Sequence, residues 1–553
     1  MYIRVKTSNE AKTTYVQIVQ AIRKGEKVSQ RIVRHVGVAH SKDGLEKLRM
    51  LAASMKVALE AGDQQFLFKP EEITSLGPKD RQYDDEDYKV DLKDLVEEQR
   101  LVAGIHDVYG KLFDDLGYSK VLANPARNKM VVRILKDIVA ARIANPASKR
   151  ASVLKLEEDF GITIDLDKVY RMMDRLDSRA IDKIKKTAYE NTLSLLGQKI
   201  NVIFYDVTTL YFESFDSDEL KACGYSKDGK NNQPQVLLTL MVTNEGLPID
   251  YEVFSGSTYE GHTLEDALSK IRDKYEIASV VFVADSAMAS SDNLARLEKL
   301  KDRISYIVGA RIKNLNEDMK AKILDSKNYS QIEPGFSVAT FEYNGKRLIV
   351  SYSERRAAKD GHNRDKAIEK LSKKIAKSKS TKSHISNSGY RKYLKIQGTS
   401  NIVIDQEKIK TDSIWDGLHG IITNSSLGTT DVLGKYSDLW TVEAAFRVTK
   451  HDLAVRPIFH WKPQRVRAHI GICFIAYSLV KNLEYRVKLQ YRPLSIETIR
   501  QTLLRVQTSI LFDKKKRIRY GLPSKMKQDA KKIYKLMGIS RRITPYIIEK
   551  CKK

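Results

Sequence analysis

The sequence has few cysteines and no long apolar run. Three cysteines in 553 residues, Cys223, Cys473 and Cys551, lie too far apart for a disulfide framework or a zinc site, so we expect a cytoplasmic protein. The longest apolar run, IGICFIAYSLV at 470–480, is too short to span a bilayer, and MYIRVKTSNE at the start lacks the apolar core of a signal peptide. No glycine-rich P-loop is present. We therefore expect neither a membrane partner nor a requirement for ATP.

Negative charge is also scarce. Lys and Arg number 97 and Asp and Glu number 70, which gives a formal net charge of +27 and a pI near 9.6. Most of the excess falls in residues 301–400 and 481–553, where Lys and Arg alternate with Tyr, Ile and Leu. We interpret these two stretches as basic surfaces that bind a polyanion. The alternative is that they only keep the protein soluble.

The chain is too long for one hydrophobic core, since such cores stop growing at about 250–300 residues. β-type alternation near the start, helical periodicity from about 95 to 197 and a basic end divide it further. The helical part is equally compatible with DNA reading by a helix-turn-helix module and with plain helical packing. We predict these regions: a β-rich N-terminal region with a helix and a linker (1–90), a helical and possibly DNA-binding region (91–198), the first part of an α/β core (199–312), a β-rich insertion (313–420), the second part of the core (421–485) and a basic helical C-terminal region (486–553).

Buried strands identify the α/β core. INVIFYDVTTLYF, from 200, is apolar on both faces, which is typical of a strand in the middle of a sheet. Residues 235–256 form two further strands joined around Asn244–Gly246, and SVVFVAD at 279–285 is a second buried strand. Residues 336–353 then predict a hairpin that turns at Asn344–Gly345, which marks the start of the insertion.

Three carboxylates stand out by their context. Asp206 and Asp285 lie within or at the end of apolar strands, and Glu443 lies on an amphipathic helix. Burying ionised carboxylates costs several kcal/mol unless a cation compensates them. Oxygen ligands without a Cys or His pattern favour Mg²⁺ or Mn²⁺, and two ions about 3.5–4 Å apart would suit phosphodiester displacement. As alternatives, Asp206 could cap a strand end or bind a backbone amide, and Asp285 could cap the helix that follows it.

The stretch YSDLWTVEAAFRVTK at 436–450 surrounds the third carboxylate. Seven residues are close to two helical turns, so Glu443, Arg447 and Lys450 should lie along one helix face. On an isolated helix this would be no more than a solvated stripe of charge pairs, worth about 0.2–0.5 kcal/mol each.

The order of strand Asp206, strand Asp285, long insertion and helix Glu443 resembles the DDE transposases of bacterial insertion sequences. One cut-and-paste group of them carries the signature Tyr-x2-Arg-x3-Glu-x6-Lys, and this sequence has Tyr436, Glu443 and Lys450 at those positions. It departs at the arginine, where Leu439 stands.

The resemblance implies a ribonuclease H-like catalytic core with a β-rich insertion, in which Asp206, Asp285 and Glu443 hold two Mg²⁺ ions. It implies cutting at the terminal inverted repeats of the element and joining of the freed 3′ ends to target DNA, in a synaptic complex of two protomers in the bacterial nucleoid. It also implies that the remaining signature residues grip DNA: Tyr436, Trp440, Arg447 and Lys450, with Arg447 partly replacing the missing arginine.

Trp415, at the exit of the insertion, has two readings. It could stack on an unpaired base, a use worth about 1–3 kcal/mol, or it could simply pack in the core.

Two other functions stay open at this point. A ribonuclease H-like nuclease or resolvase would cut without joining, but the insertion and the 436–450 signature argue against it. A DNA-binding protein with decayed catalysis would have Leu439 as its first sign, although all three carboxylates are present.

Overall fold

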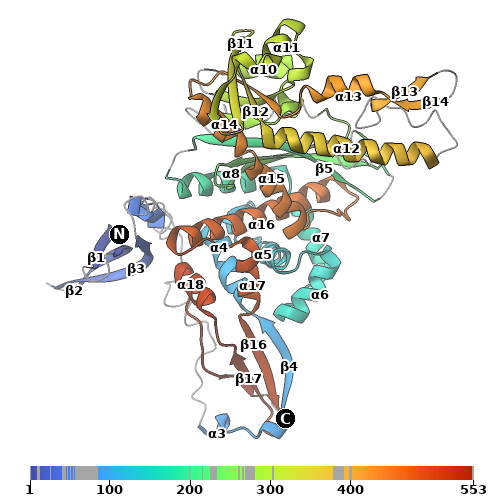
Figure 1. The fold of residues 1–553 in the computed structure, drawn as a ribbon. Coiled ribbons are helices and arrows are strands. Elements are labelled where there is room, and N and C mark those ends of the chain that lie inside the picture. Colours follow the sequence, from blue (N-terminus) through green and yellow to red (C-terminus); the bar gives the residue numbers. More distant parts are fainter. Residues whose placement is uncertain are drawn as a thin grey trace. The chain divides into compact units, whose positions relative to one another are not determined.

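The computed structural model divides the chain into two compact units (Figure 1). Unit 1 comprises residues 1–258 and 440–553, and unit 2 comprises residues 259–439. The structure describes residues 2–8, 13–24, 27–39, 45–46, 48–49, 51–53, 55–56, 85–197, 200–213, 216–224, 233–259, 262–264, 267, 280–299, 301, 304–377, 392–397 and 401–550.

Unit 1 begins with the predicted β-rich region. An antiparallel sheet is formed by β1 (Tyr2–Ser8), β2 (Thr13–Lys24) and β3 (Lys27–Ala39). Alternate apolar residues of these strands pack on Leu48 and Leu51. Residues 79–84 of the linker predicted at 79–91 lie outside the described residues, and the remainder begins with the short helix α3 (Asp85–Tyr88).

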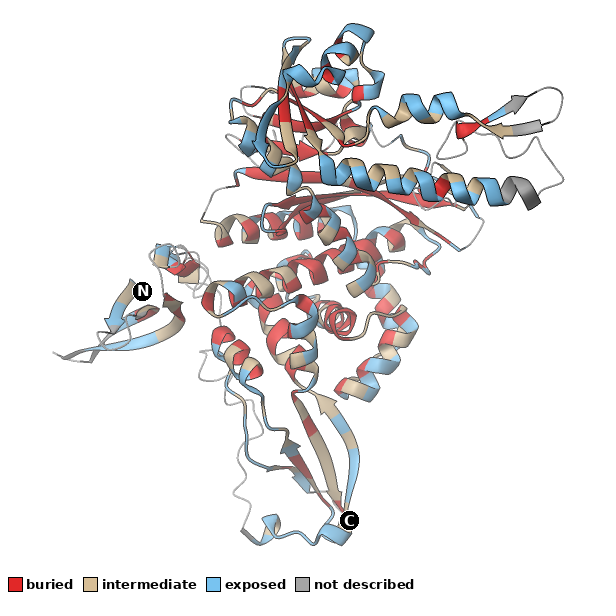
Figure 2. Cartoon of the chain, viewed as in Figure 1, coloured by how far each residue is buried: buried red, intermediate tan, exposed pale blue. Residues whose placement is uncertain are grey.

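Helices make up the next part of unit 1, as predicted for most of 91–198. They are α4 (Lys111–Asp115), α5 (Lys129–Ala144), α6 (Lys149–Phe160), α7 (Leu166–Arg175) and α8 (Ser178–Leu195). The breaks fall where the sequence disfavours a helix, and Gly161 ends α6 at φ +66°. α5, α7 and α8 pack around the 28-residue helix α16 (Pro463–Gln490), which is buried along most of its length (Figure 2).

The predicted helical C-terminal region was wrong in part. It contains α17 (Ile496–Leu504) and α18 (Gln528–Met537), but also β16 (Gln507–Asp513), β17 (Ile518–Pro523) and β18 (Tyr546–Lys550). β16 pairs with β4 (Leu95–Val102), at the start of the region predicted to be helical, and gives a sheet of order β18-β17-β16-β4. The basic run 514–517, which the sequence suggested as part of a basic helix, is the turn between β16 and β17.

The buried strands of the core are confirmed. In unit 1, β5 (Val202–Tyr211) pairs antiparallel with β6 (Gln235–Thr243), which pairs with β7 (Pro248–Ser255). β6 is buried throughout, and Gly246 turns the chain between β6 and β7 at φ +73°.

Unit 2 is built on a mixed sheet of order β10-β11-β12-β15-β9-β8, in which only β8 and β9 run parallel. Its strands are β8 (Val280–Ala284), β9 (Ile304–Ala310), β10 (Ser330–Glu333), β11 (Phe336–Tyr343), β12 (Lys346–Ser353) and β15 (Leu418–Thr423). The hairpin at Asn344–Gly345 is confirmed, with φ of 52° and 70°.

The insertion differs from its prediction as a β-rich domain. Its strands β10–β12 extend the sheet that contains β8, because β12 pairs with β15 and β15 with β9. Three helices and a separate hairpin also lie within the described part of 313–420: α11 (Glu317–Leu324), α12 (Glu354–Lys377), α13 (Gln406–Ser413) and the pair β13 (Leu394–Gln397) and β14 (Asn401–Ile404). The unit 2 helices α10 (Ser291–Glu298) and α14 (Thr429–Ser437) lie outside the insertion, α10 before it and α14 after it. Mixed α/β describes the insertion better.

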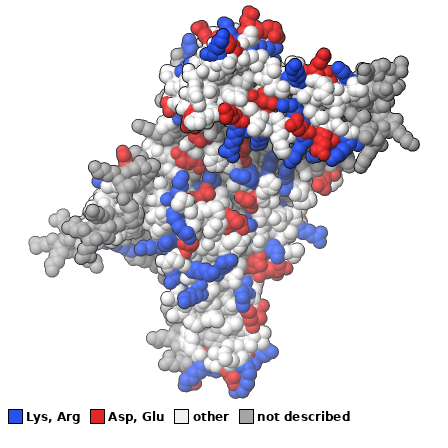
Figure 3. All heavy atoms as spheres, viewed as in Figure 1, with Lys and Arg blue, Asp and Glu red and all other residues white. Residues whose placement is uncertain are grey.

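Among the residues that the structure describes, no helix is both long and apolar enough to cross a membrane. On the face drawn in Figure 3, Lys and Arg are interspersed with Asp and Glu. The positive charge on this face is therefore spread out.

Candidate active-site residues

Asp206 lies in the middle of β5, opposite Leu240 of β6. Its neighbours on both sides are buried, whereas Asp206 itself is half-buried. The backbone N–H of Val207 donates to Asp206 Oδ1 at 2.7 Å. The hydrogen bond to a backbone amide, which was the alternative prediction for Asp206, is therefore present. The strand fixes the position of this carboxylate.

Glu443 lies in the first turn of α15 (Trp440–Arg447) and is exposed. The helix packs on β5 and β6 and buries Val442, Ala445 and Phe446. Lys450, half-buried, donates from Nζ to Thr208 Oγ1. Thr208 lies two residues after Asp206, on the same face of β5. Unit 1 thus brings the Asp206 strand and the Glu443 helix into contact and holds Lys450 beside them.

The prediction that Glu443, Arg447 and Lys450 share one α-helical face was wrong beyond Arg447. Residues Val448–Asp452 continue as a π-helix, and Leu453 N–H donates to the Val448 carbonyl across five residues. A π-turn is wider than an α-turn, so the seven-residue spacing no longer returns to the same face. Tyr436 lies on another helix altogether, α14.

A pocket of about 600 Å³ lies on unit 1 beside α15. Trp440, whose side chain is 59% exposed, lines it together with Arg447, Asp452 and Tyr477. Glu443 and Lys450 are not among its lining residues. Trp440 and Arg447 therefore line this pocket, whereas Lys450 contacts β5 through Thr208.

Asp285 belongs to unit 2, at the carboxyl end of β8. It caps the 3₁₀ helix Ser286–Met288, because Ala287 N–H donates to Asp285 Oδ1 at 2.9 Å. The cap that the sequence allowed is present at the expected position, but it caps only this short 3₁₀ helix, and Ser290 caps the α-helix that follows. Arg311, which sequence reasoning missed, donates from Nε to the Ser286 carbonyl at 3.1 Å and supports this turn.

Tyr436 reaches the same part of unit 2. A Cβ built on Gly309 of β9 would lie 2.4 Å from the Tyr436 hydroxyl and 3.0 Å from Ser286 N, so both are close to Gly309. The Tyr436 ring also lies 5.1 Å from the His419 ring. Burial lowers the pKa of His419 to about 4, so this imidazole is neutral near pH 7. No spacing in the sequence links His419 to Tyr436.

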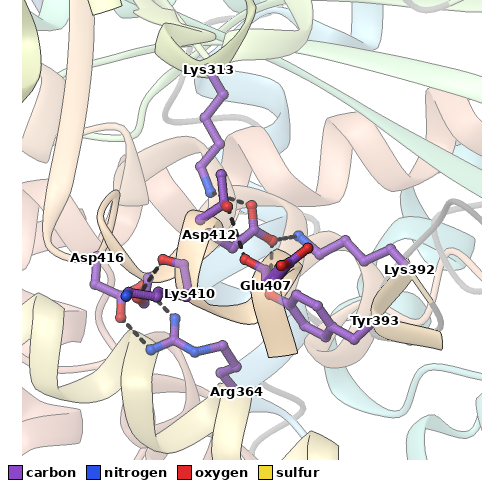
Figure 4. Close-up of polar contacts among 10 residues, drawn as sticks. Lys313, Arg364, Lys392, Tyr393, Glu407, Lys410, Asp412 and Asp416 are labelled. Carbon is purple, nitrogen blue, oxygen red and sulfur yellow. Dashed lines mark hydrogen bonds and ion pairs between the residues drawn. The ribbon is translucent and has the colours of Figure 1, made fainter. Parts of the chain in front are cut away.

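Trp415, half-buried, follows α13 in a segment held by ion pairs (Figure 4). Asp412 binds Lys392 and accepts from Tyr393 Oη at 2.8 Å, and Asp416 accepts two bonds from Arg364, at 2.6 and 2.7 Å. These contacts fix the backbone on both sides of Trp415.

The three carboxylates are divided between the units, with Asp206 and Glu443 in unit 1 and Asp285 in unit 2. Within the described ranges, no group of three or more His, Cys, Asp or Glu forms a metal site. The donors themselves suit a hard cation, since all are carboxylate oxygens and none of the three is fully buried.

Comparison with known families now adds to this geometry. Residues 197–479 match the family described as "Transposase DDE domain", and residues 3–65 match "IS1634 family transposase, N-terminal domain". No curated protein matches the chain. Among solved structures, a piggyBac transposase synaptic complex with hairpin DNA is similar at a TM-score of 0.39 and 10% identity, over 72% of this chain and 76% of that one.

Proposed function

The chain belongs to the DDE transposases of insertion sequences, enzymes that cut DNA and transfer strands, and we propose that Asp206, Asp285 and Glu443 are its catalytic carboxylates. The observation that carries this assignment is the packing of the Glu443 helix on the Asp206 strand. The family match from 197 to 479 includes all three residues. Asp285 extends the set because it ends the buried strand β8.

DDE chemistry depends on a divalent metal, and we propose Mg²⁺, with Mn²⁺ as a substitute and two ions per site. Bound ions would activate the attacking water or 3′-hydroxyl and stabilise the leaving oxygen. Asp206, Asp285 and Glu443 would hold them through carboxylate oxygens. The backbone amide bonds on Asp206 and Asp285 use one oxygen of each carboxylate and orient the group.

The enzyme binds DNA, and we propose five contact residues. Lys450 would present its ammonium to a phosphate beside Asp206, from the position that its bond to Thr208 sets. Arg447 and exposed Trp440 would meet DNA at the mouth of their pocket, and Tyr436 would do so beside Asp285. Trp415 would stack on an unpaired base from its fixed segment.

The remaining proposals concern whole regions of the chain and its assembly. We propose a ribonuclease H-like core in 199–312 and 421–485, reading of the terminal inverted repeats by 1–90 and 91–198, and further DNA contacts from the basic region 486–553. We also propose a homodimer in the synaptic complex, action on the bacterial nucleoid, and no use of ATP. Membership of an insertion-sequence family and the net charge of +27 support these proposals.

The test is excision and joining of a plasmid-borne marker flanked by the DNA that surrounds the gene, with Mg²⁺. Asp206→Asn, Asp285→Asn and Glu443→Gln keep the side-chain shape, and each should lower excision by about 1,000-fold or more, because metal binding is lost. Glu190→Gln and Asp318→Asn, at exposed positions in units 1 and 2, are the matched controls and should excise as wild type. Lys450→Ala should weaken end binding or cleavage and leave folding intact.

Other outcomes separate the rivals. Cleavage by the wild type without joining would identify a nuclease or resolvase. Tight end binding with no cleavage by any variant would identify a decayed enzyme. Full activity of any folded carboxylate variant would remove that residue from the catalytic set.

A further inference from the structure

A short segment of unit 1 between the π-helix and α16 exposes two large aromatic side chains. Along residues 457–461, Ile458 and His460 are buried, whereas Phe459 is 61% exposed and Trp461 is 67% exposed. The alternation follows an extended backbone, whose side chains point to opposite sides in turn. Burial of one side therefore forces both aromatics outward.

The buried side of the segment is anchored on α7. The His460 ring lies edge-on to Tyr170 at 6.2 Å, and burial lowers the pKa of His460 to about 3, which keeps it neutral. Arg465 stacks over Tyr170 at 4.8 Å and binds Asp174 through two bonds of 2.7 Å. Figure 1 shows α7 beside the start of α16, as these contacts require.

The contacts of His460 and Arg465 with α7 thus hold the segment that carries Phe459 and Trp461 in place. A protein that exposes two neighbouring aromatics on an ordered segment keeps apolar surface in contact with water, which marks a binding surface more often than an accident of packing. Because the segment is already ordered, a ligand would meet little additional entropy cost on binding.

The positive charge near the two aromatics favours an anionic ligand. Residues 453–468, the part of the chain next to the two aromatics, contain four Lys and Arg and no Asp or Glu. Lys462, next to Trp461, is exposed, and α7 adds exposed Arg171 and Arg175. Of the two aspartates of α7, Asp174 is bound to Arg465 and Asp167 is exposed in the first turn. Aromatic rings with cations around them are typical of surfaces that bind single-stranded nucleic acid, where bases stack and phosphates meet the cations.

We propose that Phe459 and Trp461 form a stacking surface for unpaired DNA bases, separate from the DNA contacts proposed at 436–450. The surface deepens the proposed function by naming unpaired DNA as the form that this part of unit 1 holds. It requires DNA as the ligand but does not depend on the three carboxylates.

Trp461 itself reports the contact. The protein has three tryptophans, so Trp415→Phe/Trp440→Phe leaves Trp461 as the sole indole. Titration of this variant with a 20-residue oligo-dT should quench its emission, because a stacked base lies against the ring. Unchanged emission at saturating oligonucleotide would overturn the proposal.

Affinity gives the second readout. In the full-length protein, Phe459→Ala/Trp461→Ala should weaken oligo-dT binding by about 5- to 100-fold per stacked base and leave the salt slope unchanged, since stacking releases no counterions. Lys462→Gln should instead lower the salt slope by about one. Ile543→Ala, which truncates another apolar side chain of unit 1 that is 74% exposed, should change neither.

Three results would overturn the inference. The first is wild-type affinity of the double aromatic variant for oligo-dT. The second is a shift from dimer to monomer in sedimentation without a loss of DNA affinity, which would make this surface a contact with a second copy. The third is an equal loss from Ile543→Ala. Failure of the wild type to excise its element would count against the proposed function alone, because oligo-dT binding needs no cleavage.

Discussion

Buried charge distinguishes the two units. Among the described residues, every buried charged side chain belongs to unit 1: Asp137, Arg142, Lys149, Lys185, Lys221, Asp250, Arg486 and Asp513. The buried polar residues of unit 2 are all uncharged: Thr263, Asn293, Ser351, Thr423 and Ser425. The core of unit 1 therefore depends on ion pairing and on pH, whereas that of unit 2 rests on apolar packing and neutral hydrogen bonds.

The signature stretch is divided in the same way. The boundary between the units falls between Leu439 and Trp440, within 436–450. Unit 2 holds Tyr436 close to the turn after Asp285, and unit 1 holds Lys450 beside the strand of Asp206. Each unit thus carries one aspartate and one end of the signature, and each half can be perturbed separately.

The largest effect on stability should come from Lys185, one of three buried lysines among the described residues of unit 1. Lys185 binds Glu252 and lies 3.9 Å from Asp250, which is fully buried. Lys185→Met would remove a buried cation from beside both carboxylates, so the free energy of unfolding should fall by about 3–5 kcal/mol. Lys149 donates to neutral His469 Nδ1 at 3.2 Å and lies near Arg142, so Lys149→Met should be neutral or stabilising.

Urea unfolding at pH 7, followed by circular dichroism, measures the free energy of unfolding of the wild type and of both variants. A loss for Lys185→Met alone is the expected result. Equal losses would mean that burial of the aliphatic stem, and not pairing of the charge, determines what each lysine contributes.

The second effect is a dependence of stability on pH that Lys149 imposes on unit 1. Burial, with Arg142 nearby, lowers the pKa of Lys149 from 10.5 to about 7. Between those values the unfolded chain binds more protons than the folded one, so stability rises with pH, by up to about 1.4 kcal/mol per pH unit. Compared with Lys149→Met, the wild type should therefore gain about 2–3 kcal/mol from pH 7 to pH 9. A constant difference between the two proteins across this range would contradict the shift.

The third effect is confined to unit 2. Gly309→Ala would put a methyl group 2.4 Å from the Tyr436 hydroxyl and 3.0 Å from Ser286 N, and should cost about 1–3 kcal/mol of stability. Tyr436→Phe removes the nearer atom, so the double variant should recover part of this loss. A double-mutant cycle from thermal unfolding measures the coupling. Strict additivity would show that the tyrosine moves aside freely and does not rest on the Asp285 turn.

Regular patterns let the sequence predict most buried strands. β5 and β8 were found because their residues are apolar on both faces, and the hairpin of β11 and β12 because Asn344–Gly345 fixes its turn. The C-terminal strands were missed because they are short and flank the basic run 514–517, which is the turn between β16 and β17; a run of Lys and Arg beside apolar residues does not by itself distinguish a turn from a basic helix.

In the candidate site, too, the sequence predicted the features that follow a regular pattern and missed those that do not. Asp206 and Asp285 were predicted from where apolar strands place them, and the helix of Glu443 from its amphipathic pattern. Spacing could not show that the helix widens into a π-turn after Arg447, because no side-chain pattern encodes that change. Thr208 was within reach of strand alternation, two residues beyond Asp206. Arg311 and His419 were not, since only the tertiary fold brings them to Ser286 and Tyr436.

The smallest effect tests the position where the signature fails. Leu439 is half-buried at the end of unit 2, and its N–H donates to the Tyr436 carbonyl at 3.1 Å. Leu439→Arg would restore the signature, and the arginine stem can cover the surface that leucine covers now. One added phosphate contact should raise end affinity by up to about tenfold at low salt and steepen the salt slope by about one.

Leu433→Arg is the matched control, because Leu433 is also half-buried, in α14. Both variants add the same charge, so an equal gain from each would be a general attraction to DNA. A gain in cleavage from Leu439→Arg alone would show that the site still has room for the missing arginine. If neither variant gains and Arg447→Ala loses affinity, Arg447 already occupies that role from the pocket in unit 1.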